Sequence, residues 1–190
     1  MIFKLLGFYD YTVILTYISL FSGVFGMFFA VTGHVNAAVY FLLFSGFCDL
    51  FDGKIARTKK NRTDEEKRFG IQIDSLNDIV CFGVLPAMIT VAVGCDKIWH
   101  AVIAAFFVLC GLIRLAYFNV TEEDRQKSTT ENRKTYTGLP ITSSSVIIPL
   151  VLCFKKLVPN SLPEIYSATL LITGILFISP ITVKKPLSSK

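Results

Sequence analysis

Residues 34–57 read HVNAAVYFLLFSGFCDLFDGKIAR, and residues 70–94 read GIQIDSLNDIVCFGVLPAMITVAVG. Each segment is long enough for an α-helix to cross a membrane, which takes about 20 mainly apolar residues for a hydrocarbon core of about 30 Å. Four further segments are similarly apolar, at residues 11–32, 99–120, 139–157 and 163–183. The sequence therefore predicts an all-α fold, a membrane bundle of six transmembrane helices that forms a single domain over residues 1–190.

The composition agrees with a protein that lies in the lipid bilayer. Of the 190 residues, 53% are hydrophobic and 17% are charged, and the mean hydropathy is +0.58. The formal net charge of +5 does not indicate nucleic-acid binding, because the basic residues cluster between the apolar segments, where membrane topology explains them. The five cysteines are widely separated, without metal-type or redox-type spacing, and we expect them to be packing residues.

Lysine and arginine residues predict the orientation of the bundle. Six spans place both termini on the same side, and most of the 19 Lys and Arg residues fall on that side. They are concentrated in the two long polar connections, TKKNRTDEEKR (58–68) and TEEDRQKSTTENRKTYTG (121–138). Because cytoplasmic loops carry an excess of Lys and Arg, we expect the two termini and both connections to be cytoplasmic.

Four aspartates lie inside the ends of the two quoted segments. Asp49 and Asp52 are three residues apart and Asp74 and Asp78 are four apart, so each pair shares one helix face. Antiparallel helices would place all four at a similar depth on the cytoplasmic side. A charge at membrane depth costs at least ~2.5 kcal/mol, and charges of one sign also repel each other. We therefore expect two divalent cations to compensate them, although helix-end acids facing water are the alternative.

The types of ligand narrow the choice of metal and of reaction. Both histidines of the chain fall at the opposite membrane face, so the candidate ligands are all oxygen atoms. Such a site favours Mg²⁺ or Mn²⁺, and paired ions of this kind suit phosphoryl transfer. Gly53 and Gly70, beside the acids, would leave room for a nucleotide or diphosphate, or would serve only close helix packing.

The stretch DLFDGKIAR at residues 49–57, with the spaced Gly70, Asp74 and Asp78, resembles the signature of the CDP-alcohol phosphatidyltransferases. That signature is DxxDGxxAR, a spacer, and then GxxxDxxxD. The resemblance covers residues 49–78, and the six-span architecture agrees with it over the whole chain. Twelve residues separate Arg57 from Gly70, where the usual pattern has eight. The four additional residues fall in the charged stretch NRTDEEKR, which is interpreted as a loop extension that leaves the site intact.

The resemblance implies roles for individual residues. The metal ligands would be Asp49, Asp52, Asp74 and Asp78. Asp78 would also be the catalytic general base that removes the proton of the acceptor hydroxyl. The residues in contact with the CDP moiety would be Gly53, Ala56, Arg57 and Gly70.

Three other stretches resemble the phosphatidylserine synthase branch of this family: QIDSLNDIVCFGVLPA (72–87), GLIRLAYFNV (111–120) and YTGLPI (136–141). In that branch the donor is CDP-diacylglycerol, the acceptor is L-serine and CMP is released. One departure is Thr142, where the pattern has proline. Glycerol phosphate or inositol phosphate as acceptor, and an archaeal CDP-diether as donor, stay open. The resemblance also implies a homodimer.

Arg114 lies inside the fourth span and is expected to face the bundle interior or a wet cavity. It would bind an acceptor carboxylate or a phosphate with help from Asn119, or be a snorkelling or internally paired arginine. Thr16 would reach the nucleotide or only pack between helices. Two other classes of protein are a cation transporter, disfavoured because the non-cytoplasmic halves of the spans are apolar, and an inactive membrane scaffold.

Overall fold

The computed structural model describes residues 6–56, 58–59, 61–128, 135–157 and 159–184. Its elements, in chain order, are α1 (Tyr11–Val31), α2 (Val35–Ala56), α3 (Asp64–Asp78), the π-helix η1 (Ile79–Val84), α4 (Leu85–Ala92), α5 (Ile98–Ser128), β1 (Thr135–Thr137), the short helix η2 (Ile141–Ser143), α6 (Ser144–Cys153), the short helix η3 (Pro159–Ser161), α7 (Leu162–Ile178) and β2 (Thr182–Lys184). The predicted helical bundle is confirmed. The two three-residue strands, which the sequence did not predict, form an antiparallel pair with Tyr136 opposite Val183.

Side-chain caps fix where two of the long helices begin. Asp10 caps α1, since its side chain accepts a hydrogen bond from the backbone N–H of Thr12 at 2.8 Å. Thr63 and Glu66 form a reciprocal capping box at the start of α3. This cap starts α3 at Asp64, six residues before the predicted start of the third span at residue 70. Part of the charged connection is therefore helical.

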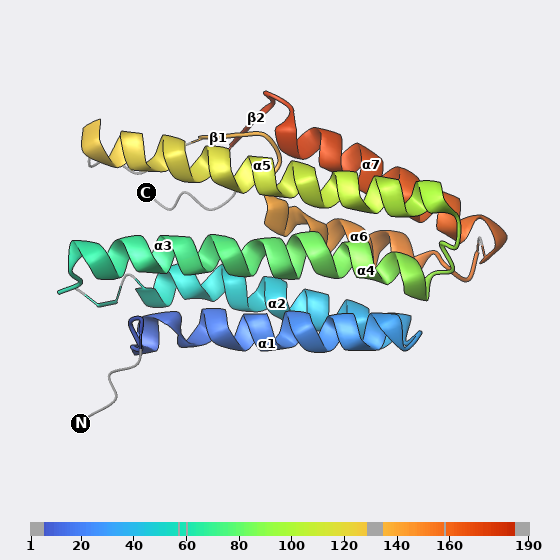
Figure 1. Ribbon diagram of the computed structural model, residues 1–190, viewed down its shortest axis with the longest axis horizontal. Helices are drawn as coiled ribbons and strands as arrows, with labels where there is room; N and C mark the ends of the chain where they lie inside the picture. The colour runs from blue at the N-terminus through green and yellow to red at the C-terminus, as the bar shows by residue number, and fades with distance from the viewer. Residues whose placement is uncertain (1–5, 57, 60, 129–134, 158, 185–190) are drawn as a thin grey trace.

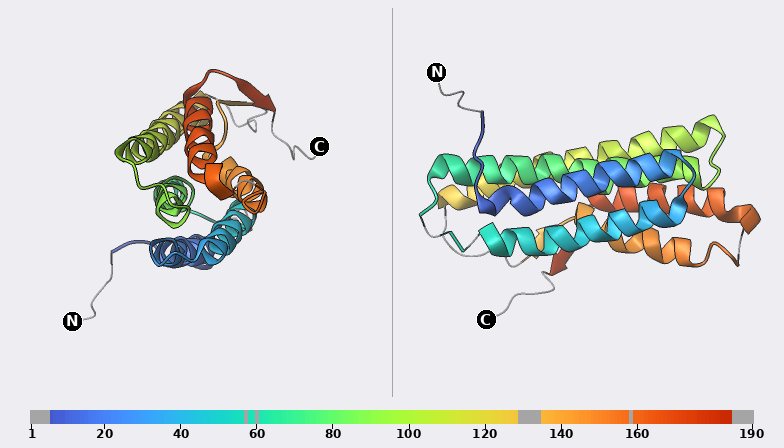
Figure 2. Two further views of the ribbon diagram at one scale, coloured as in Figure 1. Left: turned by 90° about the vertical axis from the view of Figure 1, so that its right-hand side faces the viewer. Right: turned by 90° about the horizontal axis from the view of Figure 1, so that it is seen from below.

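The helices alternate in direction, and one of them lies inside the others. Figure 1 shows α1 and α2 as antiparallel neighbours and α3, η1 and α4 as one continuous rod. Seen end-on in Figure 2 (left), this rod lies in the concave side of an arc made by α1, α2, α6, α7 and α5. The rod carries two of the four candidate aspartates, so they are placed at the centre of the bundle.

Within the residues that the structure describes, five helices are long and apolar enough to cross a membrane: Tyr11–Val31, Val35–Ala56, Asp64–Ala92, Ile98–Arg125 and Pro159–Ile178. The fifth predicted span, 139–157, contains only the shorter apolar helix Ile141–Cys153. At about 1.5 Å per residue this helix is roughly 20 Å long. The helix does not start earlier, because Pro140 restricts the preceding residue to extended backbone and Gly138 has a φ of +78°. It ends at Cys153, and residues 154–157 form turns.

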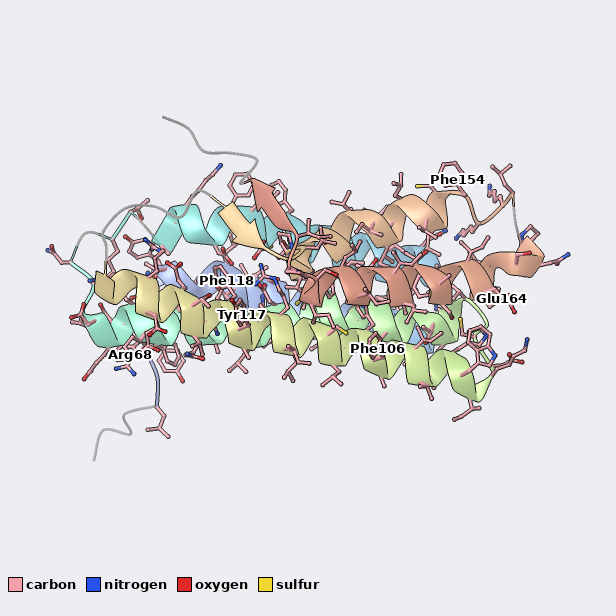
Figure 3. All side chains as sticks on the ribbon, turned by 90° about the horizontal axis from the view of Figure 1, so that it is seen from above. Arg68, Phe106, Tyr117, Phe118, Phe154 and Glu164 are labelled. Atoms are coloured by element: carbon pink, nitrogen blue, oxygen red, sulfur yellow. The ribbon has the colours of Figure 1, made fainter. Side chains whose placement is uncertain are left out.

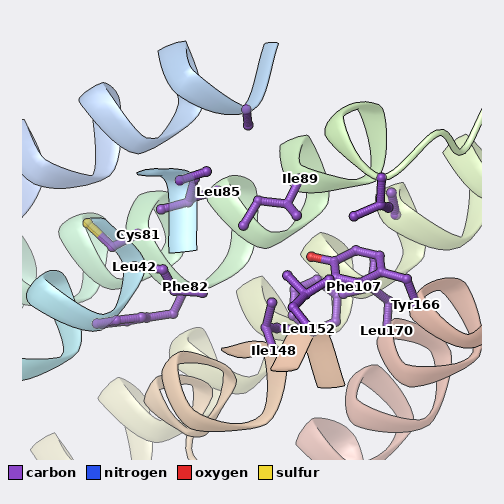
Figure 4. Packing of buried hydrophobic residues seen from close by; sticks show 14 of the residues in the cluster. Leu42, Cys81, Phe82, Leu85, Ile89, Phe107, Ile148, Leu152, Tyr166 and Leu170 are labelled. Atoms are coloured by element: carbon purple, nitrogen blue, oxygen red, sulfur yellow. The ribbon is translucent and has the colours of Figure 1, made fainter. Parts of the chain in front are cut away.

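The apolar core is assembled around the central rod (Figure 4). Cys81, Phe82, Leu85 and Ile89 are fully or almost fully buried on η1 and α4. They pack with residues of the surrounding helices, among them Leu42, Phe107, Ile148, Tyr166 and Leu170. The Tyr166 hydroxyl donates a hydrogen bond to the carbonyl oxygen of Pro86 at 2.8 Å, which satisfies this polar group inside the core.

Alanine substitutions at two glycines of α2 should have opposite effects on the stability of the protein. A Cβ atom at Gly46 would lie 2.5 Å from the Ser145 Oγ of α6, whereas a Cβ at Gly53 would meet no atom within 4 Å. We expect Gly46→Ala to lower the free energy of unfolding by about 1–3 kcal/mol through overpacking. Gly53→Ala should raise it by up to about 1 kcal/mol, because alanine favours the helix.

Thermal unfolding of the purified variants in detergent, without nucleotide, measures this difference. Gly53→Ala is the matched control for Gly46→Ala, because both changes add one methyl group to the same helix. Equal melting temperatures for the two variants would contradict the close packing of α2 against α6.

Candidate active site

Helices α2 and α3 bring the four predicted aspartates together. Asp49 and Asp52 lie in the last two turns of α2, and Asp74 and Asp78 lie in the last two turns of α3. One carboxylate oxygen from each of Asp49, Asp74 and Asp78 lies within 4.8 Å of the others. Asp52 is outside this three-residue cluster but lines a cavity next to it together with Asp74. The predicted spacing thus produces a cluster of three carboxylates and an adjacent fourth.

The charge of these carboxylates is not compensated by the part of the chain that the structure describes. The oxygens Oδ2 of Asp52 and Oδ1 of Asp74 and Asp78 are buried and accept no hydrogen bond there. No ion pair among residues 6–56, 58–59, 61–128, 135–157 and 159–184 includes them. An uncompensated buried carboxylate is strongly destabilising. Converging, unbonded carboxylate oxygens are the ligands that hard divalent cations prefer, so these residues fit a metal ion.

A cavity of about 160 Å³ opens beside the aspartates between α1, α2 and α3. Its lining residues are Thr12, Val13, Thr16, Asp52, Gly53, Ala56, Arg62, Lys67, Gly70, Ile71 and Asp74. Gly53, Ala56 and Gly70, which the sequence assigns to nucleotide binding, all lie on it, and so does Thr16. The fourth assigned residue, Arg57, lies outside the described residues.

Two basic residues of this cavity were missed from the sequence. Arg62 lies just before α3, and Lys67 lies on its first turns. Lys67, Gly70, Ile71 and Asp74 follow the i, i+3, i+4, i+7 spacing of a single helix face. This spacing was the signal that could have shown Lys67 on the cavity wall, had the helix been extended into the charged connection.

An ion-pair network fixes the connection between α2 and α3. The Lys59 ammonium donates to Asp10 at 2.8 Å and to Glu66 at 2.9 Å. The hydrogen bond from Lys59, with that from Thr12, lowers the pKa of Asp10 to about 2. The network joins the N-terminal cap of α1 to the capping box of α3, so the two walls of the cavity are held together at this end.

Asp78 is followed directly by the π-helix, and a buried polar network holds this part of the rod. Asn77 Nδ2 donates to Ser19 Oγ at 3.2 Å, and Cys81 Sγ donates to Asn77 Oδ1 at 3.3 Å. Ser45 Oγ donates to the carbonyl oxygen of Ser19 at 3.2 Å. π-Helical turns are often found at functional sites. Here the network holds the Asn77 side chain against α1. It thereby fixes how the helix that carries Asp78 is rotated about its own axis.

The two residues predicted for acceptor binding are in different surroundings. Asn119 accepts a hydrogen bond from Ser75 Oγ at 3.0 Å, which ties α5 to α3 next to Asp74. Arg114 is buried, as predicted, but lines a second cavity of about 230 Å³ with the C-terminal end of α7. Its guanidinium lies 5.4 Å from the ring centre of Phe118, and Figure 3 shows that part of α5. The structure does not bring Arg114 to the cavity of Asp52 and Asp74.

Comparison with known proteins identifies the family of the chain. The sequence profile of the CDP-alcohol phosphatidyltransferase family matches residues 12–179, and the chain belongs to this family. The chain is 40% identical over 133 residues to a CDP-diacylglycerol–serine O-phosphatidyltransferase of Saccharomyces cerevisiae, covering 67% of the chain and 47% of the yeast protein. It is therefore aligned to about half of that relative's length.

Two further relatives have related names. A CDP-diacylglycerol–serine O-phosphatidyltransferase of Helicobacter pylori is 32% identical over 169 residues, which cover 86% of the chain and 67% of the relative. An archaetidylserine synthase of Methanothermobacter thermautotrophicus is 35% identical over 128 residues, covering 67% of the chain and 51% of the relative. Both names refer to serine, but the lipid in them differs.

Proposed function

We propose that this chain transfers the phosphatidyl group from CDP-diacylglycerol to L-serine, producing phosphatidylserine and CMP. The observation that carries the proposal is the cluster of Asp49, Asp74 and Asp78 beside a cavity whose wall includes Gly53 and Gly70. The names of the yeast and bacterial relatives support serine as the acceptor.

In the proposed reaction the nucleotide half of the donor occupies the cavity, and the lipid-bearing phosphate lies at the aspartate cluster. The serine hydroxyl oxygen forms a bond to the lipid-bearing phosphorus, and the bond from that phosphorus to the oxygen bridging to CMP breaks. Asp78 takes the hydroxyl proton, since a carboxylate next to an alcohol is suited to general base catalysis. Two divalent cations, Mg²⁺ or Mn²⁺, held by Asp49, Asp52, Asp74 and Asp78, would neutralise the diphosphate charge.

We further propose that the bundle crosses the bilayer six times, with both termini and the active site on the cytoplasmic side. The distribution of Lys and Arg supports this orientation. The alternating helix directions in Figure 1, with α6 as a short crossing between α5 and α7, support the number of crossings. The homodimer stays a prediction from the family resemblance, and the lipid bilayer is the expected environment of the exposed apolar faces.

A second candidate donor is an archaeal CDP-diether lipid. The observation in its favour is the relative named archaetidylserine synthase, whose identity of 35% is between those of the yeast and bacterial relatives. Both donors share the CDP headgroup, so the cavity and the aspartate cluster would serve either one.

The test is CMP release by the purified full chain in detergent with Mg²⁺ or Mn²⁺. CDP-diacylglycerol and its diether analogue are the donors, and L-serine, glycerol 3-phosphate and inositol phosphate are compared as acceptors. We expect release that needs both metal and L-serine. Release with another acceptor would keep the class of reaction but contradict serine, and no release from folded protein would favour the transporter or scaffold readings.

A further inference from the structure

Arg62 lines the cavity between α1, α2 and α3, and its guanidinium lies against the start of α3. Its Nη2 donates a hydrogen bond to the carbonyl oxygen of Glu66 at 3.0 Å. A Cβ atom at Gly70 would lie 2.5 Å from the same nitrogen. The guanidinium therefore occupies the space over α3 that the absence of a side chain at Gly70 leaves open.

The guanidinium keeps unused hydrogen-bonding capacity in this position. Its Nε is buried, and within the described portion of the chain it has no hydrogen-bond partner. No carboxylate of that portion forms an ion pair with Arg62. An arginine carries five N–H donors in a planar fork that matches the oxygens of a phosphate. A buried donor without an acceptor is costly, and an anionic ligand in the cavity would satisfy it.

The charge of the cavity wall changes from negative at one end to positive at the other. Asp52 and Asp74 lie at the end near the aspartate cluster, and Arg62 and Lys67 lie at the other end. Lys67 is seven residues before Asp74, which corresponds to about 10 Å along α3. Lys67 itself pairs with the exposed Asp64 at 3.0 Å, an interaction of little energetic weight at the surface. A cation fits the acidic end of this wall, and an anionic group fits the basic end.

We propose that Arg62 is a donor-binding residue, whose guanidinium binds the phosphate attached to the cytidine, with Lys67 as a second cation nearby. This inference rests on the proposed function, because it takes the reacting, lipid-bearing phosphate to lie at Asp78. The phosphate attached to the cytidine shares one oxygen with the reacting phosphate, so it lies beside Asp74, which is four residues, or about 6 Å along α3, from Gly70 and the Arg62 guanidinium. Arg62 and Lys67 both lie between the DxxDGxxAR and GxxxDxxxD motifs and are part of neither.

Binding of CMP to the purified full chain with Mn²⁺ tests this role, together with the KM for CDP-diacylglycerol. Arg62→Ala should weaken CMP binding about tenfold to a hundredfold, as expected for a hydrogen bond to a charged group. The KM for the donor should rise by a similar factor with kcat nearly unchanged, since the contact exists in both ground and transition states. Arg62→Lys should lose less, because it keeps the charge without the fork.

Arg68→Ala is the matched control, because Arg68 is an exposed cation of α3 that does not line the cavity. Figure 3 shows it at the end of the bundle. This variant should stay within about twofold of the unmodified chain in CMP affinity, as expected for an exposed charge. An equal loss in Arg68→Ala and Arg62→Ala would overturn the inference, since it would show a general effect of positive charge.

Two further outcomes would separate the inference from the function on which it rests. If the unmodified chain binds CMP and releases it with serine while Arg62→Ala keeps the same affinity and KM, the inference alone fails. A lower melting temperature with unchanged CMP affinity would show that Arg62 only stabilises the connection through Glu66, and it would also overturn the inference. If the unmodified chain binds no CMP, both the inference and the proposed function fail.

Discussion

Replacement of Asp78 by asparagine should abolish nearly all CMP release while the chain stays folded. Asp78 is 8% exposed and belongs to the three-carboxylate cluster at the end of α3. Asparagine has the same shape but cannot take a proton from the serine hydroxyl. General base catalysis contributes about 10²–10⁴-fold, so we expect a decrease in kcat of this order.

Asp64→Asn is the matched control, since it makes the same chemical change at an exposed position of the same helix. Its kcat should be within about twofold of the unmodified chain, because the pairing of the exposed Asp64 with Lys67 has little energetic weight at the surface. The kcat for CMP release and the affinity for CMP are measured for both variants. A kcat for Asp78→Asn within a few-fold of the unmodified enzyme would remove Asp78 from the mechanism.

Removal of divalent metal should have a comparably large effect. Metal ions contribute several kcal/mol of charge stabilisation in such reactions, and each 1.4 kcal/mol corresponds to a factor of ten in rate. We therefore expect EDTA to lower CMP release at least about a hundredfold, and added Mg²⁺ or Mn²⁺ to restore it. The buried, unbonded oxygens of Asp74 and Asp78 are the structural reason.

Thermal unfolding supplies a readout of metal binding that does not depend on turnover. A metal ion that binds only the folded state stabilises it by about 2.7 kcal/mol at a concentration of a hundred times its Kd. The melting temperature should therefore rise with added metal in the unmodified chain and in Asp64→Asn, but much less in Asp49→Asn. The same rise in Asp49→Asn would show that the cluster is not the metal site.

The aspartate cluster could be predicted because it depends on helix periodicity alone. Two antiparallel apolar helices, with acids three and four residues apart at adjoining ends, leave few other arrangements. The assignment of Gly53, Ala56 and Gly70 to the nucleotide came from the resemblance to the family signature, and the structure places all three on one cavity wall. The pairing of the aspartates on their helix faces needs only the rise and twist of a helix.

Other features depend on interactions that periodicity does not contain. The start of α3 at Asp64 depends on the reciprocal hydrogen bonds of Thr63 and Glu66. These bonds extend the helix into a charged stretch that hydropathy alone leaves outside the predicted span. The position of Arg62 depends on one hydrogen bond to a backbone carbonyl and on the empty space at Gly70. The length of the helix within residues 139–157 was overestimated at both ends, because a hydropathy window registers neither the backbone restriction by Pro140 nor the turns of residues 154–157.

The short helix α6 has a consequence for the bilayer itself. Ser145, near its start, touches α2 at Gly46, which is one helical turn deeper than Asp49. A hydrophobic segment shorter than the hydrocarbon core is accommodated by local thinning of the membrane. We expect the headgroup layer to dip along the α6 side of the bundle, down toward the level of the carboxylates. A lipid substrate could then present its headgroup to the reaction centre by sideways diffusion, with its acyl chains still in the leaflet.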